Sequence, residues 1–260
     1  MDRNRAHEAF IAYVSAYDPT NPRIALKVDH TLRVAALCER IASSTSDDDA
    51  FVELAWLAGL LHDVGRFEQV RRYDTFNDGA SVPHAALGAE ILFSTSGAST
   101  GEPLIRPFAE PELDEALRTA VATHSDYRLP DQLDPRTRML CQILRDADKI
   151  DILKVNCICP IEDIYGVTER DMRDSQLTPA CVETFYERRC LPRGIRRHPA
   201  DIMLGHICFA WELVYEESRR IVVEQGHLRT MLSRSWTLPE TQASFQEMRE
   251  YMGRELGLGA

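Results

Sequence analysis

The chain has 260 residues, of which 44% are hydrophobic and 27% charged, as in an ordinary soluble globular protein. Its formal net charge of −11 argues against non-specific binding to nucleic acids or anionic membranes, although a local basic patch could still hold a phosphate. No apolar run approaches the ~20 residues that cross a bilayer, and the N-terminus lacks the pattern of a signal peptide. We therefore expect a cytoplasmic protein whose seven cysteines are reduced thiols.

Hydrophobic periodicity predicts helices in the first part of the chain. The first spans Arg23 to Ala42, where apolar residues recur with helical spacing around His30. The second covers residues 51–63, which are apolar nearly all round, as in a helix buried in a core. Gly65 follows this helix, where a left-handed C-terminal stop is commonly needed. Residues 66–83 are expected to form an irregular surface segment.

The rest of the chain shows further helical patterns and almost no strand pattern. The composition of residues 94–103 predicts a loop, and the helical signal weakens between Val155 and Leu177. We predict an all-α fold with a single domain over residues 1–260, a core at about 23–155 and a C-terminal helical extension at about 160–255. The further helices are expected near 84–93, 113–124, 136–155, 201–224 and 241–256.

Three histidines, His30, His62 and His124, lie on or at the end of apolar helical stripes, and Asp63 directly follows one of them. A buried imidazole needs partners for both ring nitrogens, and a buried carboxylate costs several kcal/mol unless it is paired or bound to a cation. For a single histidine we would favour a backbone carbonyl partner. For several such groups in one core, a divalent cation that binds neutral imidazoles and carboxylates together is the better interpretation.

The order of these residues resembles the signature of the HD-domain superfamily of metal-dependent phosphohydrolases. The segment GLLHDVGRFEQ is similar to the family's LLHDIG segment, and VDHTLRVAALCERIA resembles its first motif, with His30 as a ligand. The segment RDADKID resembles the closing motif, which implies that Asp148 is the last ligand. Helical periodicity by itself leaves Asp146 and Asp148 open. The resemblance covers about residues 23–155 and implies a helical bundle with additional C-terminal helices.

Two further histidines extend the resemblance to the HD-GYP cyclic-dinucleotide phosphodiesterases. His84 and His124 stand where those proteins carry additional ligands. The GYP motif is missing, and only one histidine stands where those proteins carry a His-His pair, so no specificity for cyclic di-GMP carries over. The resemblance implies two divalent ions (Fe, Mn, Ni, Co or Zn) bridged by Asp63. The implied ligands are His30, His62, Asp63, His84, His124 and Asp148.

Basic residues near the His-Asp doublet suit a phosphate substrate. Arg66 resembles the phosphate-contacting lysine of HD-GYP sites, so we predict catalytic roles for Asp63 and Arg66. Arg66, Arg72 and Lys149 are the predicted substrate-binding residues. A solvated surface residue is the alternative for Arg72, and a structural ion pair is the alternative for Lys149. Residues 73–78 are expected to form a lid or substrate wall, or else an exposed connector.

The resemblance implies hydrolysis of a phosphomonoester or phosphodiester, most naturally nucleotide-like, by a metal-bridging hydroxide. The first alternative is an HD-fold mixed-valent di-iron oxygenase, whose ligands follow the same order along the chain. The second is a non-catalytic nucleotide-binding HD module, which would require a broken ligand set. We expect a small-molecule phosphate as partner and neither a membrane nor a nucleic-acid polymer. The oligomeric state is left open.

Overall fold

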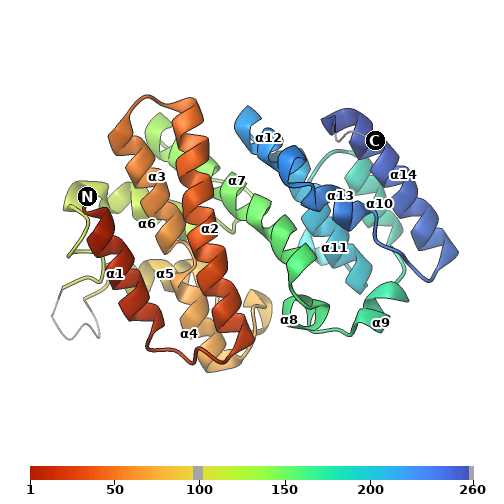
Figure 1. Ribbon diagram of the computed structural model, residues 1–260, viewed down its shortest axis with the longest axis horizontal. Coiled ribbons are helices and arrows are strands. Elements are labelled where there is room, and N and C mark those ends of the chain that lie inside the picture. The colour runs from red at the N-terminus through yellow and green to blue at the C-terminus, as the bar shows by residue number, and fades with distance from the viewer. Residues whose placement is uncertain (96–101, 258–260) are drawn as a thin grey trace. The chain divides into compact units, whose positions relative to one another are not determined.

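The computed structural model describes residues 1–95 and 102–257, and in this part of the chain every regular element is a helix (Figure 1). The predicted all-α fold is therefore confirmed. The chain divides into two compact units, Met1–Asp148 and Lys149–Ala260, with the boundary inside one long helix. The predicted single-domain organisation stays a prediction. Most of the loop expected at 94–103 lies outside the described residues.

The first unit contains the helices that position the histidines. Their bounds are α1 Arg3–Val14, α2 Pro22–Thr45, α3 Asp49–Leu61, α4 Val64–Tyr73, η1 Asp78–Ala80, α5 His84–Phe93, η2 Pro111–Leu113, α6 Asp114–Thr123 and the start of α7 Pro135–Ile158.

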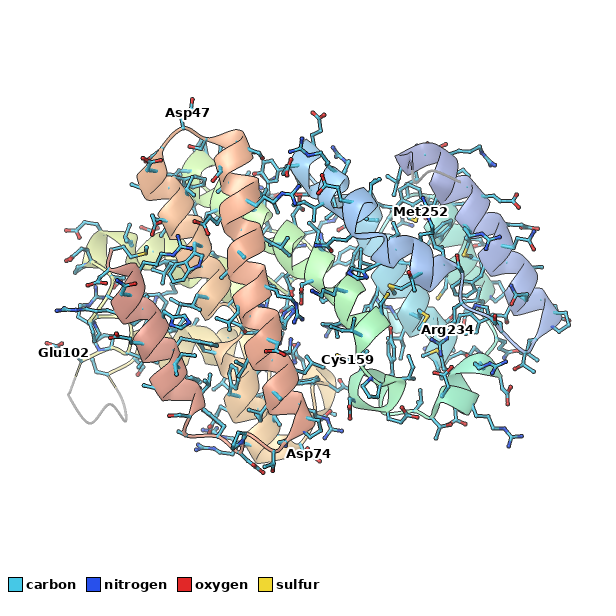
Figure 2. The ribbon with its side chains drawn as sticks, viewed as in Figure 1. Asp47, Asp74, Glu102, Cys159, Arg234 and Met252 are labelled. Atoms are coloured by element: carbon cyan, nitrogen blue, oxygen red, sulfur yellow. The ribbon has the colours of Figure 1, made fainter. Side chains whose placement is uncertain are left out.

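Helices α2 and α3 lie side by side in this unit (Figure 1). The Asn21 side chain caps the first turn of α2, and the Asp48 side chain caps that of α3, which satisfies backbone N–H groups that have no partner within the helix. At Gly59 the two backbones approach closely, because a Cβ atom there would lie 2.7 Å from Cα of Ala35. The connection between the helices faces solvent, and Figure 2 shows Asp47 projecting outward from it.

The segment after the His-Asp doublet corrects the sequence prediction. Residues 66–83 are predicted to be irregular, but residues 66–73 belong to helix α4, which spans Val64–Tyr73. The helix buries Val64, Phe67 and Val70 at a spacing of three residues, which places them on one face. It ends at Asp74, whose φ of 49° is left-handed. A short amphipathic helix thus runs away from the doublet instead of a surface loop.

Gly65 also has a role other than the predicted helix stop, since it lies inside α4 with a helical backbone. A Cβ atom at this position would lie 2.2 Å from the carbonyl oxygen of His84 and 2.6 Å from the backbone nitrogen of Gly88. Glycine is therefore needed here for the close approach of α4 and α5. This contact fixes the start of α5, and with it His84, against the doublet.

The second unit contains the end of α7, several short helices and the longer helix α14. The helical pattern predicted over 201–224 is interrupted, because Cys208–Glu212 forms a 3-10 turn between two α-helices. Met248 and Met252 of the last helix are buried, and Met252 is labelled in Figure 2. No described helix is long and apolar enough to span a membrane. The bounds are α8 Ile161–Tyr165, α9 Glu169–Arg173, α10 Pro179–Tyr186, η3 Arg193–Ile195, α11 Pro199–Ile207, η4 Cys208–Glu212, α12 Glu216–Gln225, α13 His227–Leu232 and α14 Pro239–Leu256.

Replacement of Gly65 by alanine tests the close approach of α4 and α5. The added methyl group would meet backbone atoms, which cannot rotate away, so we expect a loss of about 1–3 kcal/mol in the free energy of unfolding. Urea denaturation followed by circular dichroism measures it. The matched control is Gly253→Ala in α14, where a Cβ atom meets nothing within 4 Å and alanine should stabilise by up to about 1 kcal/mol. Equal effects of the two substitutions would contradict this account.

Candidate metal centre

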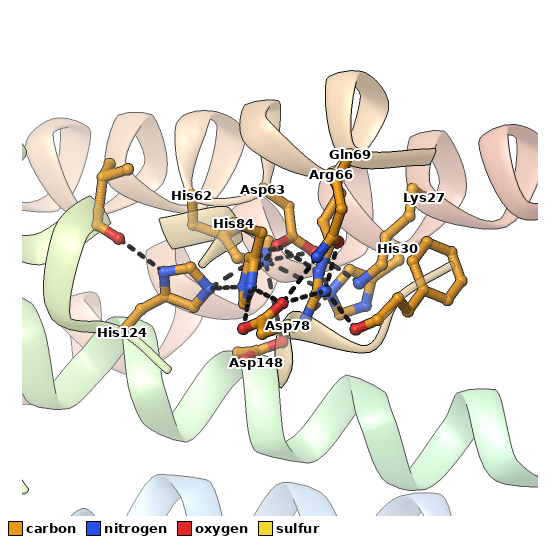
Figure 3. Close-up of polar contacts among 12 residues, drawn as sticks. Lys27, His30, His62, Asp63, Arg66, Gln69, Asp78, His84, His124 and Asp148 are labelled. Carbon is orange, nitrogen blue, oxygen red and sulfur yellow. Dashed lines mark hydrogen bonds and ion pairs between the residues drawn. The ribbon is translucent and has the colours of Figure 1, made fainter. Parts of the chain in front are cut away.

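The structure brings the six predicted metal ligands together in the first unit (Figure 3). The four histidines and Asp63 are each at most 5% exposed, and the Asp148 side chain is 16% exposed. Five helical segments contribute: His30 lies in α2, His62 and Asp63 follow α3, His84 begins α5, His124 follows α6, and Asp148 lies in α7.

Two of the imidazoles are oriented by helix ends. His62 and His124 each stand directly after a helix, where the carbonyl groups of the last turn need hydrogen-bond donors. Nδ1 of His62 donates to the carbonyl oxygen of Gly59 at 2.8 Å, and Nδ1 of His124 donates to that of Val121 at 2.7 Å. A carbonyl only accepts, so the proton of each neutral ring is on Nδ1 and the lone pair is on Nε2.

A carboxylate orients the third imidazole. Nδ1 of His84 donates to Asp78, with distances of 2.8 and 2.9 Å to the two carboxylate oxygens. Burial and the nearby Arg66 lower the pKa of His84 to about 3, so the ring is neutral. Burial opposes ionisation of Asp78, but His84 and Arg66 outweigh it and hold the pKa of this carboxyl well below its usual range. A carboxylate–histidine pair of this kind fixes the ring and leaves Nε2 available to a metal.

The Nε2 atoms face one another in pairs. The Nε2–Nε2 distance is 3.3 Å between His30 and His62 and 3.0 Å between His84 and His124. Burial also lowers the pKa of His62. The lone pairs of His84 and His124 therefore point at each other, which is unfavourable unless a positive centre lies between them. Two nitrogens bound to one ion at about 2.0–2.1 Å would be roughly 3.0–3.4 Å apart, so these pairs have the separation that a metal requires.

Asp63 lies between the two histidine pairs. Its Oδ2 is 3.5 Å from Nε2 of His30 and 3.3 Å from Nε2 of His62. Its Oδ1 is 3.5 Å from Nε2 of His84 and 3.7 Å from Nε2 of His124. Each carboxylate oxygen thus faces one pair, as a carboxylate shared by two ions would.

The structure places Asp148, and not Asp146, among these donors. Oδ1 of Asp148 is 3.1 Å from Nε2 of His30 and 3.8 Å from Nε2 of His62. Asp146 is buried in the same helix but does not join any donor group found among the described residues. Burial raises the pKa of Asp148, yet the adjacent imidazoles outweigh it and hold that pKa well below its usual value.

The predicted substrate-binding residues lie in different surroundings. Nε of Arg66 is 3.7 Å from Oδ1 of Asp63, at the edge of the donor cluster. Arg72 is half exposed and pairs with Glu68 on its own helix. Lys149 belongs to the second unit, where its Nζ lies 3.6 Å from Oε2 of Glu212. These contacts match the surface and ion-pair alternatives for Arg72 and Lys149, and their substrate-binding roles stay predictions.

Sequence reasoning missed Lys27, and it placed Asp78 in the predicted lid or wall without foreseeing its contacts. Nζ of Lys27 lies 2.6 Å from Oδ2 of Asp63, and its spacing of three residues from His30 on one helix is a signal that could have identified it. Asp78 contacts both His84 and Arg66, but it reaches them from a loop and a 3-10 turn for which no periodicity exists.

Metal binding should stabilise the folded protein. After chelator treatment, we expect Mn²⁺ or Zn²⁺ to raise the unfolding temperature by several degrees, because an ion at 100 times its Kd adds about 2.7 kcal/mol. Differential scanning fluorimetry measures the shift, and His62→Gln should abolish most of it. The control is His7→Gln, which changes an exposed histidine of α1. A metal-induced shift that survives in His62→Gln would place the ion elsewhere.

The comparison with protein families agrees with this geometry. Residues 28–153 match the family model described as the HD domain, and this range includes all six predicted ligands. No curated protein and no solved structure gives a significant match. Within the superfamily, HD domains hold divalent metals with the kind of histidine and aspartate cluster that lies here. Residues 28–153 of the chain therefore form an HD domain, the domain that defines a superfamily of metal-dependent phosphohydrolases.

Proposed function

We propose that the protein is a metal-dependent phosphohydrolase that binds two divalent ions and hydrolyses a phosphomonoester or phosphodiester, with nucleotide-like substrates the most natural. The observation that carries the proposal is the position of Asp63, whose two oxygens each face a separate pair of imidazole Nε2 atoms. When bound, two such ions would activate water and stabilise the charge that develops on the phosphoryl oxygens.

Arg66 supports a phosphate substrate in this site. The two N–H groups of its Nη1 are shared among three acceptors, the carbonyl oxygen of Phe76 at 2.7 Å, Oε1 of Gln69 at 2.7 Å and Oδ1 of Asp78 at 2.9 Å. These three acceptors hold the guanidinium beside Asp63. Donors that are fixed before the reaction cost no reorganisation when charge develops in the transition state.

The same guanidinium has an unused donor. Nε of Arg66 is buried and has no hydrogen-bond partner among the described residues. Buried donors almost always have an acceptor, so a buried N–H beside the donor cluster suggests that an acceptor arrives with the substrate. A phosphoryl oxygen is an acceptor of the right charge. Cζ of Arg66 and Nζ of Lys27 lie 5.6 and 5.4 Å from the centroid of the Phe76 ring. Because this ring packs against both cations, it supports the prediction that residues 73–78 form a wall of the substrate site.

The number of ions can be measured directly. We expect two divalent ions per chain after loading with Mn²⁺ or Fe²⁺, determined by mass spectrometry of the desalted protein. The double variant His84→Gln/His124→Gln removes one imidazole pair and should retain one ion, held by His30, His62 and Asp148. One ion in the parent protein would contradict the two-ion proposal and leave a one-metal hydrolase.

The activity is tested by a phosphatase screen over nucleotides and sugar phosphates, run separately with Mn²⁺, Fe²⁺, Ni²⁺ and Co²⁺. Release of orthophosphate from at least one substrate is the expected result. The oxygenase alternative predicts instead a reaction that consumes dioxygen and needs a mixed-valent iron pair, so the oxidation state of bound iron and the oxygen dependence distinguish the two.

Arg66→Ala should lower the turnover of the substrate found in that screen about 10²–10³-fold, the usual loss for one transition-state donor. Metal content should not change, because a guanidinium is not a ligand. Arg66→Lys should restore part of the activity, since it keeps the charge and loses the paired donors. Arg118→Ala, on the exposed side of α6, is the matched control. Parent-level turnover in Arg66→Ala would refute the role in phosphate binding.

A further inference from the structure

Lys27 is the closest cation to the central carboxylate. Its Nζ is 2.6 Å from Oδ2 of Asp63, and its side chain is only 13% exposed. Among the described residues, Asp63 is the only carboxylate that pairs with Lys27. In the metal-free protein, Lys27 therefore supplies the counter-charge of Asp63.

The ammonium and a metal ion would use the same oxygen. His30, His62 and Asp63 form one of the donor groups that could hold an ion, and Oδ2 is the Asp63 oxygen that faces this imidazole pair. An ion bound there would take electron density from Oδ2 and repel the neighbouring ammonium. Lys27 would then lose its partner while remaining buried, and a buried cation without an anion is unfavourable.

Lys27 differs from Arg66 in its freedom to move. Three acceptors hold Nη1 of Arg66, whereas Lys27 carries its charge at the end of a flexible four-carbon chain beside the Phe76 ring. The two cations also lie on opposite oxygens of Asp63, with Lys27 at Oδ2 and Arg66 at Oδ1. A phosphoryl group held by the ions would thus have a fixed donor on one side and a movable donor on the other.

We propose that Lys27 is a further substrate-binding residue. Its ammonium group pairs with Asp63 in the metal-free protein and moves to pair with a phosphoryl oxygen once ions and substrate are bound. The inference rests on the proposed function, because it assumes a phosphate substrate on a loaded donor cluster. It makes two predictions of opposite sign: Lys27 opposes metal binding and favours phosphate binding. A purely structural lysine would weaken both when removed.

The experiment uses the full chain, stripped by a chelator, with Mn²⁺ and orthophosphate as probes in isothermal titration calorimetry. Lys27→Met should lower the Kd for Mn²⁺ about tenfold or more. It should raise the Kd of the Mn²⁺-loaded protein for orthophosphate by a similar factor, because one hydrogen bond to a charged group contributes a free energy of about that size. Lys27→Arg should keep both constants closer to the parent values. Arg23→Met is the matched control, since Arg23 lies one turn earlier on α2 and pairs with exposed Asp74.

Lys27→Met without metal is expected to be less stable, because Asp63 lacks its ammonium partner. A second measurement therefore keeps the test valid if this variant unfolds more easily. The Mn²⁺-induced rise in unfolding temperature should be larger in Lys27→Met than in the parent and unchanged in Arg23→Met. Weaker binding of both probes by Lys27→Met, or parent-level orthophosphate binding, would overturn the inference and leave the proposed function standing. If the Mn²⁺-loaded parent bound no orthophosphate, the proposed function and the inference would fall together.

Discussion

Asp63 carries a negative charge on a side chain that is only 2% exposed, and a buried charge costs several kcal/mol unless cations or hydrogen-bond donors surround it. The site is arranged around this requirement. Lys27 contacts one carboxylate oxygen, Arg66 lies near the other, and a pair of imidazoles faces each. Because three of these imidazoles carry their proton on Nδ1, they present lone pairs to the carboxylate and cannot neutralise it by hydrogen bonding. The arrangement becomes favourable when cations occupy the space between them.

The helices serve this arrangement at their ends. His62 and His124 donate hydrogen bonds to free carbonyl groups in the last turns of α3 and α6. The same hydrogen bond caps the end of the helix and fixes the orientation of the ring. Gly65 allows α4 to pass close to His84, the first residue of α5. This approach brings Nε2 of His84 near Oδ1 of Asp63, while His62 faces the other oxygen, Oδ2. Local helix geometry and the arrangement of the predicted ligands are therefore linked through a few backbone contacts.

Asp78 connects the predicted metal ligands with the proposed substrate wall. Its carboxylate accepts from Nδ1 of His84 and from Nη1 of Arg66, and Gln69 donates to it as well. One loop residue thus orients a predicted ligand and fixes the guanidinium that we assign to phosphate. Lys27 has no comparable anchor among the described residues, which is why we assign it the movable role. The two cations of the site differ in mobility although they flank the same carboxylate.

The sequence by itself determined the all-α class and most of the long helices, and its resemblance to the HD-domain superfamily implied the set of candidate ligands. Helical periodicity depends only on neighbouring residues, and such local information suffices for α2, α3 and α7. Tertiary structure alone decided the rest. Asp146 and Asp148 are equivalent to a periodicity argument and the resemblance favoured Asp148, but only the packing of α7 against the histidines places Asp148 beside His30. The role of Gly65 and the contacts of Asp78 likewise depend on which segments pack together, because the atoms that they meet are distant along the chain and no local pattern encodes them.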